Sequence, residues 1–369
     1  MQMDSGSCLR KVCLLLLSVL ALVLSNGAPS RAQDKVYDVT SFGAVADGKT
    51  DDSKFKGPCT GPIVVTVEGV VKAPADKSTF SLDHWITFQY VSGMLINGDG
   101  TFDGQGPEAW PYNECACKSL PVSVRFNFVN DTSIRSISSI NSKNFHFNVY
   151  ACNDLEFQGV RITAPDESPN TDGIHIGDSS RIKIADSVIS TGDDCVSVGP
   201  GSKDIDIVGV HCGPGHGFSV GSLGKYPDEA DVTGLTVRDC TMVGTQNGVR
   251  IKTWASTLKS TAHNFSFVDI KMKDVRSPII IDQEYCPRGG CSNETGSNVQ
   301  IKDVWFANIQ GTSASQVAVN LVCSPSLPCK NINLDNIDLA YTGDDGPTKS
   351  HCAHVEGDTS GIQKPPSCI

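Results

Sequence analysis

The pattern that decides the fold is visible in residues 174–198, IHIGDSSRIKIADSVISTGDDCVSV. Within this stretch, IHI at 174–176, IKI at 182–184 and VSV at 196–198 each place two apolar side chains around a polar one. Such alternation is typical of a β-strand with one buried face. Because a three-residue strand is too short to bury that face alone, each unit has to stack on its neighbours.

The same alternating unit recurs along most of the chain, from about Leu95 to Tyr341. An Asn or Asp usually precedes it, and an Asp or Gly often follows. Successive units begin 27, 23, 30, 30, 34 and 33 residues apart. They are Leu155-Glu156-Phe157, Ile182-Lys183-Ile184, Ile205-Asp206-Ile207, Leu235-Thr236-Val237, Phe265-Ser266-Phe267, Val299-Gln300-Ile301 and Ile332-Asn333-Leu334. A second series lies between them and comprises Ile174-His175-Ile176, Val196-Ser197-Val198, Phe218-Ser219-Val220 and Val249-Arg250-Ile251.

Several short strands per turn, at a period in the twenties and thirties, predict an all-β chain folded as a right-handed parallel β-helix. The alternative is an antiparallel sandwich or barrel, which requires a hairpin signal such as Asn-Gly between most strand pairs. Asn97-Gly98 and Asn247-Gly248 are present, but such pairs do not recur regularly. The repeats therefore favour the β-helix.

The composition agrees with this fold and narrows the function. Glycine accounts for 35 of the 369 residues, and Gly, Asn, Ser, Thr and Val are weak helix formers. The formal net charge is −11 and no basic cluster is present, which argues against a nucleic acid as partner. No low-complexity tract indicates disorder, and no domain boundary is visible between the repeats.

The first part of the chain has the pattern of a targeting segment. Arg10 and Lys11 precede an apolar run at 12–24, and small residues follow it. The run is too short to span a membrane comfortably, so we expect a signal peptide and cleavage region at 1–32, with an uncleaved anchor as the alternative. The remaining residues, 33–369, are then a single secreted β-helix domain that does not associate with membranes and is expected to be monomeric.

The cysteines and glycosylation motifs agree with secretion. Fifteen cysteines are present, of which Cys8 and Cys13 lie in the predicted signal peptide, and disulfides are typical of an oxidising compartment. Thirteen remain, so at least one thiol is expected to have no intramolecular partner. Zinc is the alternative, but no two Cys-x-x-Cys pairs occur to hold it. The short-range disulfide candidates are Cys286 with Cys291, Cys323 with Cys329 and Cys352 with Cys368; the glycosylation acceptors are Asn130, Asn264 and Asn293.

Candidate functional residues follow one another at a constant step in the second strand series. Asp172, Asp194 and His216 each precede a strand by two residues, and they are 22 residues apart. In a coil of that length they fall at one position of successive turns, about 4.8 Å apart. The next equivalent position is Asn247. We therefore expect one face of the coil to present Asp172, Asp193, Asp194, His216, Arg250 and Lys252.

This set of side chains indicates carbohydrate chemistry. Three neighbouring carboxylates repel one another, so at least one is expected to have a raised pKa and to hold a proton at mildly acidic pH. A protonated acid beside ionised carboxylates is the equipment for glycosidic bond cleavage. Arg250 and Lys252 supply the positive charge that a saccharide bearing carboxylates needs. Each acidic motif taken alone is also common in turns, and calcium is a further alternative, although the two cations argue against a calcium cage.

At these residues the chain resembles the polygalacturonases, glycoside hydrolase family 28. The four blocks that carry the resemblance are Asn170-Thr171-Asp172-Gly173, Gly192-Asp193-Asp194-Cys195, Gly215-His216-Gly217 and Arg250-Ile251-Lys252, and the similarity extends from Val36 to Cys368. The resemblance implies a right-handed parallel β-helix that hydrolyses α-1,4-linked galacturonic acid in pectin (homogalacturonan) with inversion. It implies no cofactor and no metal.

The resemblance also implies a role for each residue of the site. Asp193 corresponds to the general acid, whose protonation His216 supports, and Asp172 and Asp194 correspond to the pair that holds and deprotonates the water. The implied substrate-binding residues are Asn170, Arg250, Lys252 and Tyr285, and the implied disulfide beneath the site joins Cys195 to Cys212. Segments 224–227 and 282–287 are most similar to plant pollen exopolygalacturonases, which favours exo action over the endo alternative.

One segment departs from the family pattern. After Asp51, relatives continue with an amphipathic helix and further strands before a Gly-Pro-Cys segment, which here follows almost at once at 57–59. Several dozen residues that cap the open end of the coil are therefore expected to be missing. Residues 63–67 would lie close to that end. The alternative is that residues 36–53 fold over the end and serve as the cap. The truncated cap leaves a non-catalytic pectin-binding cell-wall protein as an alternative function.

Overall fold

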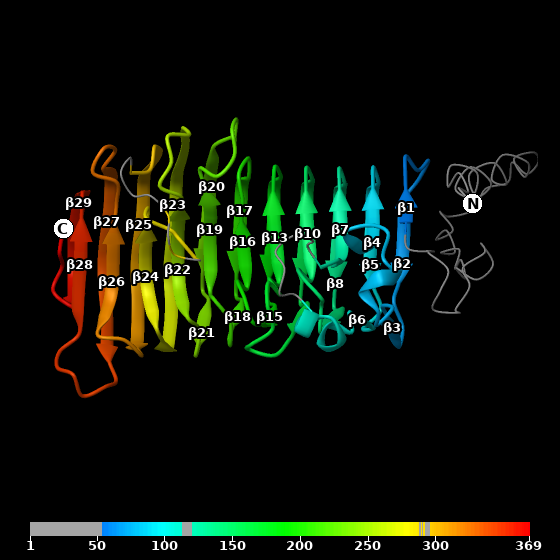
Figure 1. The fold of residues 1–369 in the computed structure, drawn as a ribbon, viewed down its shortest axis with the longest axis horizontal. Coiled ribbons are helices and arrows are strands. Elements are labelled where there is room, and N and C mark those ends of the chain that lie inside the picture. Colours follow the sequence, from blue (N-terminus) through cyan, green and yellow to red (C-terminus); the bar gives the residue numbers. More distant parts are fainter. Residues whose placement is uncertain (1–53, 113–119, 288, 290, 292–295) are drawn as a thin grey trace, which may run out of the picture.

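The computed structural model describes residues 54–112, 120–287, 289, 291 and 296–369. Over these residues the chain winds into one coil, whose strands lie side by side in chain order (Figure 1). All strand pairs in it are parallel. The structure thus confirms the right-handed parallel β-helix. The predicted signal peptide and the segment 36–53 lie outside the described residues.

The first sheet takes one strand from every turn of the coil and carries the candidate site. Its eleven strands are β1 (Lys54–Lys56), β4 (His84–Gln89), β7 (Val122–Asn127), β10 (Phe147–Tyr150), β13 (Ile174–Gly177), β16 (Val196–Val198), β19 (Phe218–Leu223), β22 (Asn247–Thr253), β24 (Ser277–Asp282), β26 (Val317–Val322) and β28 (Lys349–Ala353). Ile174 pairs with Val196, and Val196 pairs with Phe218, so the 22-residue steps of the sequence are turns of the coil.

The second sheet forms the remaining walls of the coil. In the N-terminal turns it contains two short strands per turn, and from β23 onward a single long strand spans both. The shorter strands are β2 (Ile63–Thr66), β3 (Val70–Lys72), β5 (Ser92–Asn97), β6 (Thr101–Asp103), β8 (Asn130–Arg135), β9 (Ser138–Ile140), β11 (Asn153–Gln158), β12 (Arg161–Thr163), β14 (Ser180–Ala185), β15 (Val188–Ser190), β17 (Lys203–Val208), β18 (His211–Cys212), β20 (Val232–Arg238) and β21 (Thr241–Val243). The long ones are β23 (Ser260–Val275), β25 (Val299–Ser313), β27 (Cys329–Tyr341) and β29 (Val355–Lys364).

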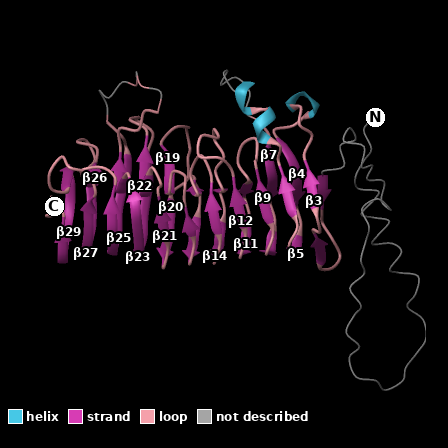
Figure 2. Cartoon of the chain, turned by 90° about the horizontal axis from the view of Figure 1, so that it is seen from below, coloured by secondary structure: helices cyan, strands magenta, loops and turns pink. Residues whose placement is uncertain are grey.

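Within the described ranges, loops and three short 3₁₀ helices project from one side of the coil, whereas the turns on the other side are tight (Figure 2). The helices are Lys77–Thr79, Gly106–Glu108 and Trp110–Tyr112. No helix of the described segments is both long and apolar enough to cross a membrane.

The Asp, Asn and Gly residues around each alternating unit are the corners of the coil. One row of corner residues stacks from turn to turn with positive φ: Asp154, Arg181, Asp204, Gly234, Asn264, Asp303 and Asn331. A second row closes the unit at Gly159, Asp186, Gly209, Asp239, Asp269, Asn308 and Asn336. Gly, Asn and Asp tolerate this left-handed conformation better than other residues. The Asp, Asn and Gly residues that flank each repeat unit therefore mark the positions at which the backbone turns a corner.

The interior is a set of stacked apolar side chains. Ile174, Val196 and Phe218 occupy one column and are almost fully buried. In the N-terminal turns the rings of Phe88 and Phe126 stack with centroids 5.5 Å apart. Each turn therefore buries its apolar face against its neighbours, as the short strands require.

One detail of the sequence prediction is wrong. The unit equivalent to Phe265 in the next turn begins at Val304 and not at Val299, because Phe265 pairs with Val304. Val299 belongs to the preceding wall of the same long strand, β25, where Val299 and Ile301 are also buried and alternate. The strands run from β1 at Lys54 to β29 at Lys364, further than the repeats recognised in the sequence but within residues 33–369.

The structure contains all four disulfides that were candidates in the sequence, Cys195–Cys212, Cys286–Cys291, Cys323–Cys329 and Cys352–Cys368. Cys152 and Cys240 are buried thiols outside these bonds. Of the glycosylation acceptors, Asn264 is exposed and Asn130 is half-buried. Asn293 lies outside the described residues.

Candidate active site

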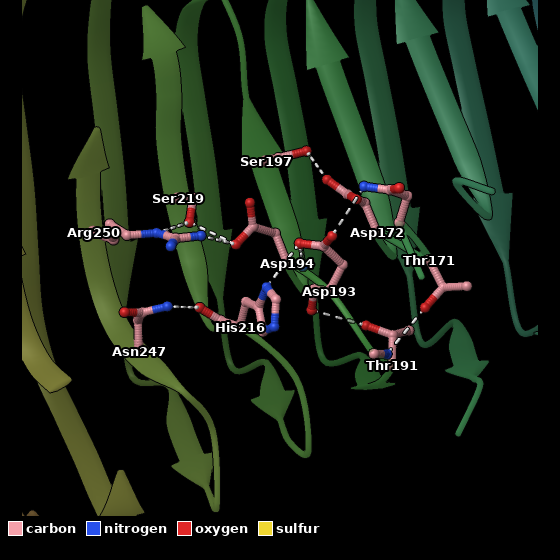
Figure 3. A network of polar contacts seen from close by, with 12 residues as sticks. Thr171, Asp172, Thr191, Asp193, Asp194, Ser197, His216, Ser219, Asn247 and Arg250 are labelled. Carbon is pink, nitrogen blue, oxygen red and sulfur yellow. Dashed lines mark hydrogen bonds and ion pairs between the residues drawn. The ribbon is translucent and has the colours of Figure 1, made fainter. Parts of the chain in front are cut away.

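The candidate site lies on the outer face of the first sheet, where several strands begin (Figure 3). Asp172, Asp194, His216 and Asn247 each precede the paired residues of β13, β16, β19 and β22 by two positions, so they share one register. Asp193 lies beside Asp194, and Arg250 projects from β22 toward it. The structure thus brings together the residues that the sequence placed on one face.

Asp194 is the centre of the charge network. Its Oδ1 accepts hydrogen bonds from Arg250 (2.8 Å) and Ser219 (2.7 Å), and its Oδ2 accepts one from Lys252 Nζ (2.8 Å). Burial alone would raise the pKa of this carboxyl, but the charges of Lys252 and Arg250 and the hydrogen bonds outweigh burial and lower its pKa to about 2. Asp194 is therefore an ionised carboxylate at any mildly acidic pH.

Asp172 lies one turn away and behaves in the opposite way. It is buried, and its Oδ2 accepts a hydrogen bond from Ser197 Oγ at 2.6 Å. Burial, followed by the repulsion of Asp193 and Asp194, raises its pKa well above the usual value of 3.8. The predicted raised pKa among the three carboxylates is thus found at Asp172.

Asp193 is the most exposed of the three carboxylates. Its side chain is 19% exposed, against 1% for Asp194. His216 Nδ1 lies 2.9 Å from its Oδ1, and Asn170 Nδ2 donates to its Oδ2 at 3.4 Å. Asn247 in turn donates to the backbone oxygen of His216 at 3.2 Å. Asp193 is therefore held in place while remaining accessible to a ligand.

Tyr285 lies on the same side of the site as the two cations. Lys252 Nζ lies 5.4 Å from the centre of its ring, and Trp254 meets that ring edge-on at 5.4 Å. Beneath the site, Cys195 and Cys212 are fully buried and join the turn that carries Asp193 and Asp194 to the wall behind it. Every predicted site residue of this cluster is within the network or directly beside it.

Three residues of the network were missed by the sequence analysis. Ser197 and Ser219 face outward between two buried apolar residues, and each supports an aspartate of the preceding turn. His175 Nδ1 lies 2.7 Å from Ser197 Oγ. Burial and the nearby charge of Lys252 lower the pKa of His175 to about 4, so it is neutral above that pH. Because Ser197 donates its one proton to Asp172, His175 donates to Ser197. The signal in the sequence that could have identified these three residues is their polar character at outward-facing strand positions close to the aspartates.

The cluster does not fit a calcium ion. Ligand atoms of Asp193, Asp194 and His216 lie within 4.8 Å of one another, which is close enough for a metal site. Both oxygens of Asp194, however, already accept bonds from Arg250 and Lys252. A calcium ion prefers six to eight oxygen ligands, and here it would have to displace two cations.

Comparison with known proteins relates the chain to plant enzymes. It is 47% identical to an exopolygalacturonase of Platanus acerifolia, over 84% of this chain and 84% of the relative. It is 43% identical to a polygalacturonase of Brassica napus, over 97% and 94% of the two chains. The alignment with an exopolygalacturonase of Zea mays, at 40% identity, spans 403 residues although it covers 96% of this shorter chain and 98% of the relative. That alignment contains gaps in this chain, as a missing segment requires.

Solved structures show the same fold. The endo-xylogalacturonan hydrolase of Aspergillus tubingensis has a TM-score of 0.70 at 21% identity, covering 86% of this chain and 98% of that one. The polygalacturonase of Erwinia carotovora has a TM-score of 0.62 at 25% identity, covering 85% and 86%. The profile of glycosyl hydrolases family 28 matches residues 35–365, nearly the whole chain. With the site intact within that match, the chain belongs to glycosyl hydrolases family 28.

Proposed function

We propose that the protein hydrolyses α-1,4-galacturonosidic bonds of polygalacturonic acid, the backbone of pectin, with inversion at the anomeric carbon. The observation that carries the proposal is a cluster of three carboxylates on two adjacent turns, one accessible and two buried, beside two cations. Asp193 is the accessible carboxylate, whereas Asp172 and Asp194 are buried, and Asp194 bonds to the two cations. This arrangement supplies both acid and base groups to one glycosidic bond.

In this reaction Asp193 is the general acid. It protonates the oxygen of the leaving group, and its exposure allows that oxygen to reach it. His216 and Asn170 hold the carboxyl group in place. Asp172 and Asp194 hold the attacking water on the other face of the sugar ring, and Asp172, which has no cation bonded to it, takes the proton of that water. Its hydrogen bond to Ser197 orients it.

Arg250 and Lys252 bind the carboxylate of a galacturonate residue. Both side chains are nearly buried, at 11% and 9% exposure, so a carboxylate that reaches them is largely desolvated. Charge-assisted bonds are strong in such surroundings. Tyr285 borders the same cations and provides a ring against which a sugar can pack.

The test of this function is release of reducing ends from polygalacturonic acid at about pH 4–6, the range in which general acid catalysis by a carboxyl operates. Asp193→Asn removes the proton donor and keeps the shape of the side chain, so activity is expected to fall about 100-fold or more. Asp204→Asn, the same change at an exposed corner of the second sheet, is the control and is expected to leave activity unchanged. Undiminished turnover in Asp193→Asn would contradict the assignment.

Exo action is part of the proposal, on the strength of the exopolygalacturonases among the relatives. A long galacturonan is then expected to yield monomer with little early loss of viscosity. An early ladder of oligomers with a rapid fall in viscosity would instead indicate endo action. Binding of oligogalacturonate with no sugar released would identify a pectin-binding protein.

The place of action in this proposal is the cell wall, where pectin is found. The four disulfides suit an oxidising extracellular compartment. We include in the proposal cleavage of the signal peptide at 1–32, glycosylation at Asn130, Asn264 and Asn293, and a monomeric mature chain. Mass spectrometry of the secreted protein tests the first two, and light scattering tests the third.

A further inference from the structure

A loop beside the site is held in place by hydrogen bonds to one carboxylate, that of Glu229. This loop, residues 224–229, is called the wall loop here; it follows β19. Glu229 accepts hydrogen bonds from the backbone N–H groups of Gly224 (2.6 Å), Lys225 (3.0 Å) and Tyr226 (2.8 Å). Three such bonds to one ionised group hold the loop in one conformation. They also satisfy Glu229 with backbone donors, so its charge is not paired with a side chain.

Lys225 is the cation of this loop, which also contains Asp228 and Glu229. It is exposed, and among the described residues it forms no ion pair. Its Nζ lies 5.0 Å from the ring centre of Tyr226 and 5.7 Å from that of Trp254. Contacts of a cation with two aromatic faces restrict where the ammonium group can lie without neutralising it.

Lys225 belongs to the same surface as the proposed cations of the site. Trp254 follows the last residue of β22 and lies two residues after Lys252. The ring of Trp254 contacts that of Tyr285, which contacts Lys252. Two aromatic rings thus separate the ammonium group of Lys225 from that of Lys252.

The charge of the central site favours a further cation for the binding of a polyanion. Arg250 and Lys252 are both bonded to Asp194. The site contains three carboxylates, those of Asp172, Asp193 and Asp194. When all three are ionised, they outnumber the two cations. A galacturonan carries one carboxylate on every sugar, so a sugar beyond the two that flank the cleaved bond is bound best where a further cation is available. Lys225 provides that cation at the edge of the site.

We propose that Lys225 and Tyr226 form a further binding subsite for a galacturonate residue, next to the one at Arg250 and Lys252. The sugar's carboxylate pairs with Lys225 Nζ, and its apolar face packs on the ring of Tyr226, which is 60% exposed. The proposal rests on the proposed function, because it places an additional sugar of the same substrate. It makes the wall loop a determinant of preference for longer chains.

The test compares substrates that differ by one sugar. In Lys225→Ala, kcat/KM for trigalacturonate and polygalacturonate is expected to fall about tenfold, mainly through KM, since a hydrogen bond to a charged group is lost. The value for digalacturonate, which is too short to fill the added subsite, is expected to stay within about twofold. Lys225→Arg should retain most of the activity on the longer substrates. Lys203→Ala, an exposed lysine on β17 in the second sheet, is the matched control.

Equal losses on both lengths, or no loss on either, would overturn the subsite. Calorimetry with trigalacturonate in the Asp193→Asn background gives a second readout that needs no turnover. Weaker binding after Lys225→Ala there supports the subsite even if the wild-type chain releases no sugar, an outcome that would defeat the proposed hydrolysis alone. Unchanged binding, or no binding of trigalacturonate at all, would defeat the subsite.

Discussion

At the scale of single residues, Asp172 and Asp194 show how neighbours set the chemistry of one side chain. The two carboxyls occupy the same register in adjacent turns and both are buried. Asp194 bonds to two cations, whereas Asp172 bonds to the hydroxyl of Ser197. Burial therefore dominates at Asp172 and raises its pKa, but at Asp194 the cations outweigh burial and lower the pKa.

The two aspartates are expected to affect stability in opposite directions. The raised pKa of Asp172 means that its contribution to stability is lost as pH rises above 3.8 and through its folded pKa. Asp172→Asn, which removes that charge, is expected to raise the melting temperature at pH 7 while abolishing activity. The gain in melting temperature should disappear at low pH, where Asp172 is protonated in both the folded and the unfolded protein. A lower melting temperature at pH 7 would contradict this.

Asp194→Asn is the contrasting variant. The lowered pKa of Asp194 contributes stability that is present above pH 3.8 and lost as pH falls through about 2. The variant leaves Arg250 and Lys252 nearly buried without their counterion, so we expect a loss of about 3–5 kcal/mol at pH 7. Denaturant unfolding of both variants measures the difference. Equal effects of the two substitutions would show that the partners do not control the carboxyls.

The pH dependence of activity follows from Asp172 as base. Asp172 must be ionised to take a proton from water, so activity is expected to fall on the acid side at a pH above 3.8, the ordinary value for an aspartate. Ser197→Ala removes the hydroxyl that favours the ionised form, and is expected to move this acid limb to higher pH. Profiles of kcat/KM for the wild type and Ser197→Ala test the shift. An unmoved limb would assign it to another group.

At the scale of elements, each strand unit ends in a corner that needs a left-handed residue. Asp204 has φ of 56° and is exposed, so its side chain contributes little beyond permitting that conformation. Arg181 stands in the same row with φ of 53°, where it bonds to Asp154 of the preceding turn at 2.6 Å and 2.9 Å. The corner is thus a backbone requirement that most turns meet with Asp, Asn or Gly.

Substitution at a corner tests this requirement. Asp204→Val is expected to cost about 1–2 kcal/mol, because a β-branched residue is strained at positive φ. Asp204→Gly should be nearly neutral. Asp206→Val, two residues further along the same strand, is the control, since β-branched residues favour extended backbone and the surface ion pair that it removes contributes little. Chemical denaturation distinguishes them. A similar loss in both Val variants would contradict a corner effect.

At the scale of the whole molecule, the N-terminal end of the coil exposes apolar side chains. β1 stands at the end of the first sheet. Val64, Val70 and Val71, on β2 and β3, are 50%, 59% and 40% exposed. Uncovered sheet edges promote aggregation, and solenoids need a polar cap for solubility. The end predicted to lack part of its cap is thus apolar where the structure describes it.

Inserting the corresponding segment of a relative after Asp51 is expected to raise the melting temperature and reduce aggregation. The added helix would cover the apolar end, and activity per folded molecule should stay the same because the site lies several turns away. Light scattering and thermal unfolding of the two proteins make the comparison. If the unaltered chain aggregates no more than the extended one and is equally stable, the missing segment is not needed as a cap.

The sequence by itself determined the β-helix and the composition of the site. Alternation, corner residues and the 22-residue steps are local or evenly spaced, so turns of equal length bring Asp172, Asp194 and His216 into one register without further information. Where turns differ in length this reasoning failed, and Val299 was placed in the position that Val304 occupies. Only the tertiary structure decided that register, because it depends on strand pairing across loops of different length.

The tertiary structure also decided what the site residues do. Asp172 and Asp194 are the same residue type at the same position before a strand. Their opposite pKa shifts arise from burial and from cations that are 56 and 58 residues away from Asp194 along the chain. The role of Ser197 and the position of Lys225 beside Trp254 likewise depend on contacts between turns. Residue types and their spacing are one-dimensional properties that a sequence displays, whereas protonation and charge pairing arise from the three-dimensional surroundings of each group.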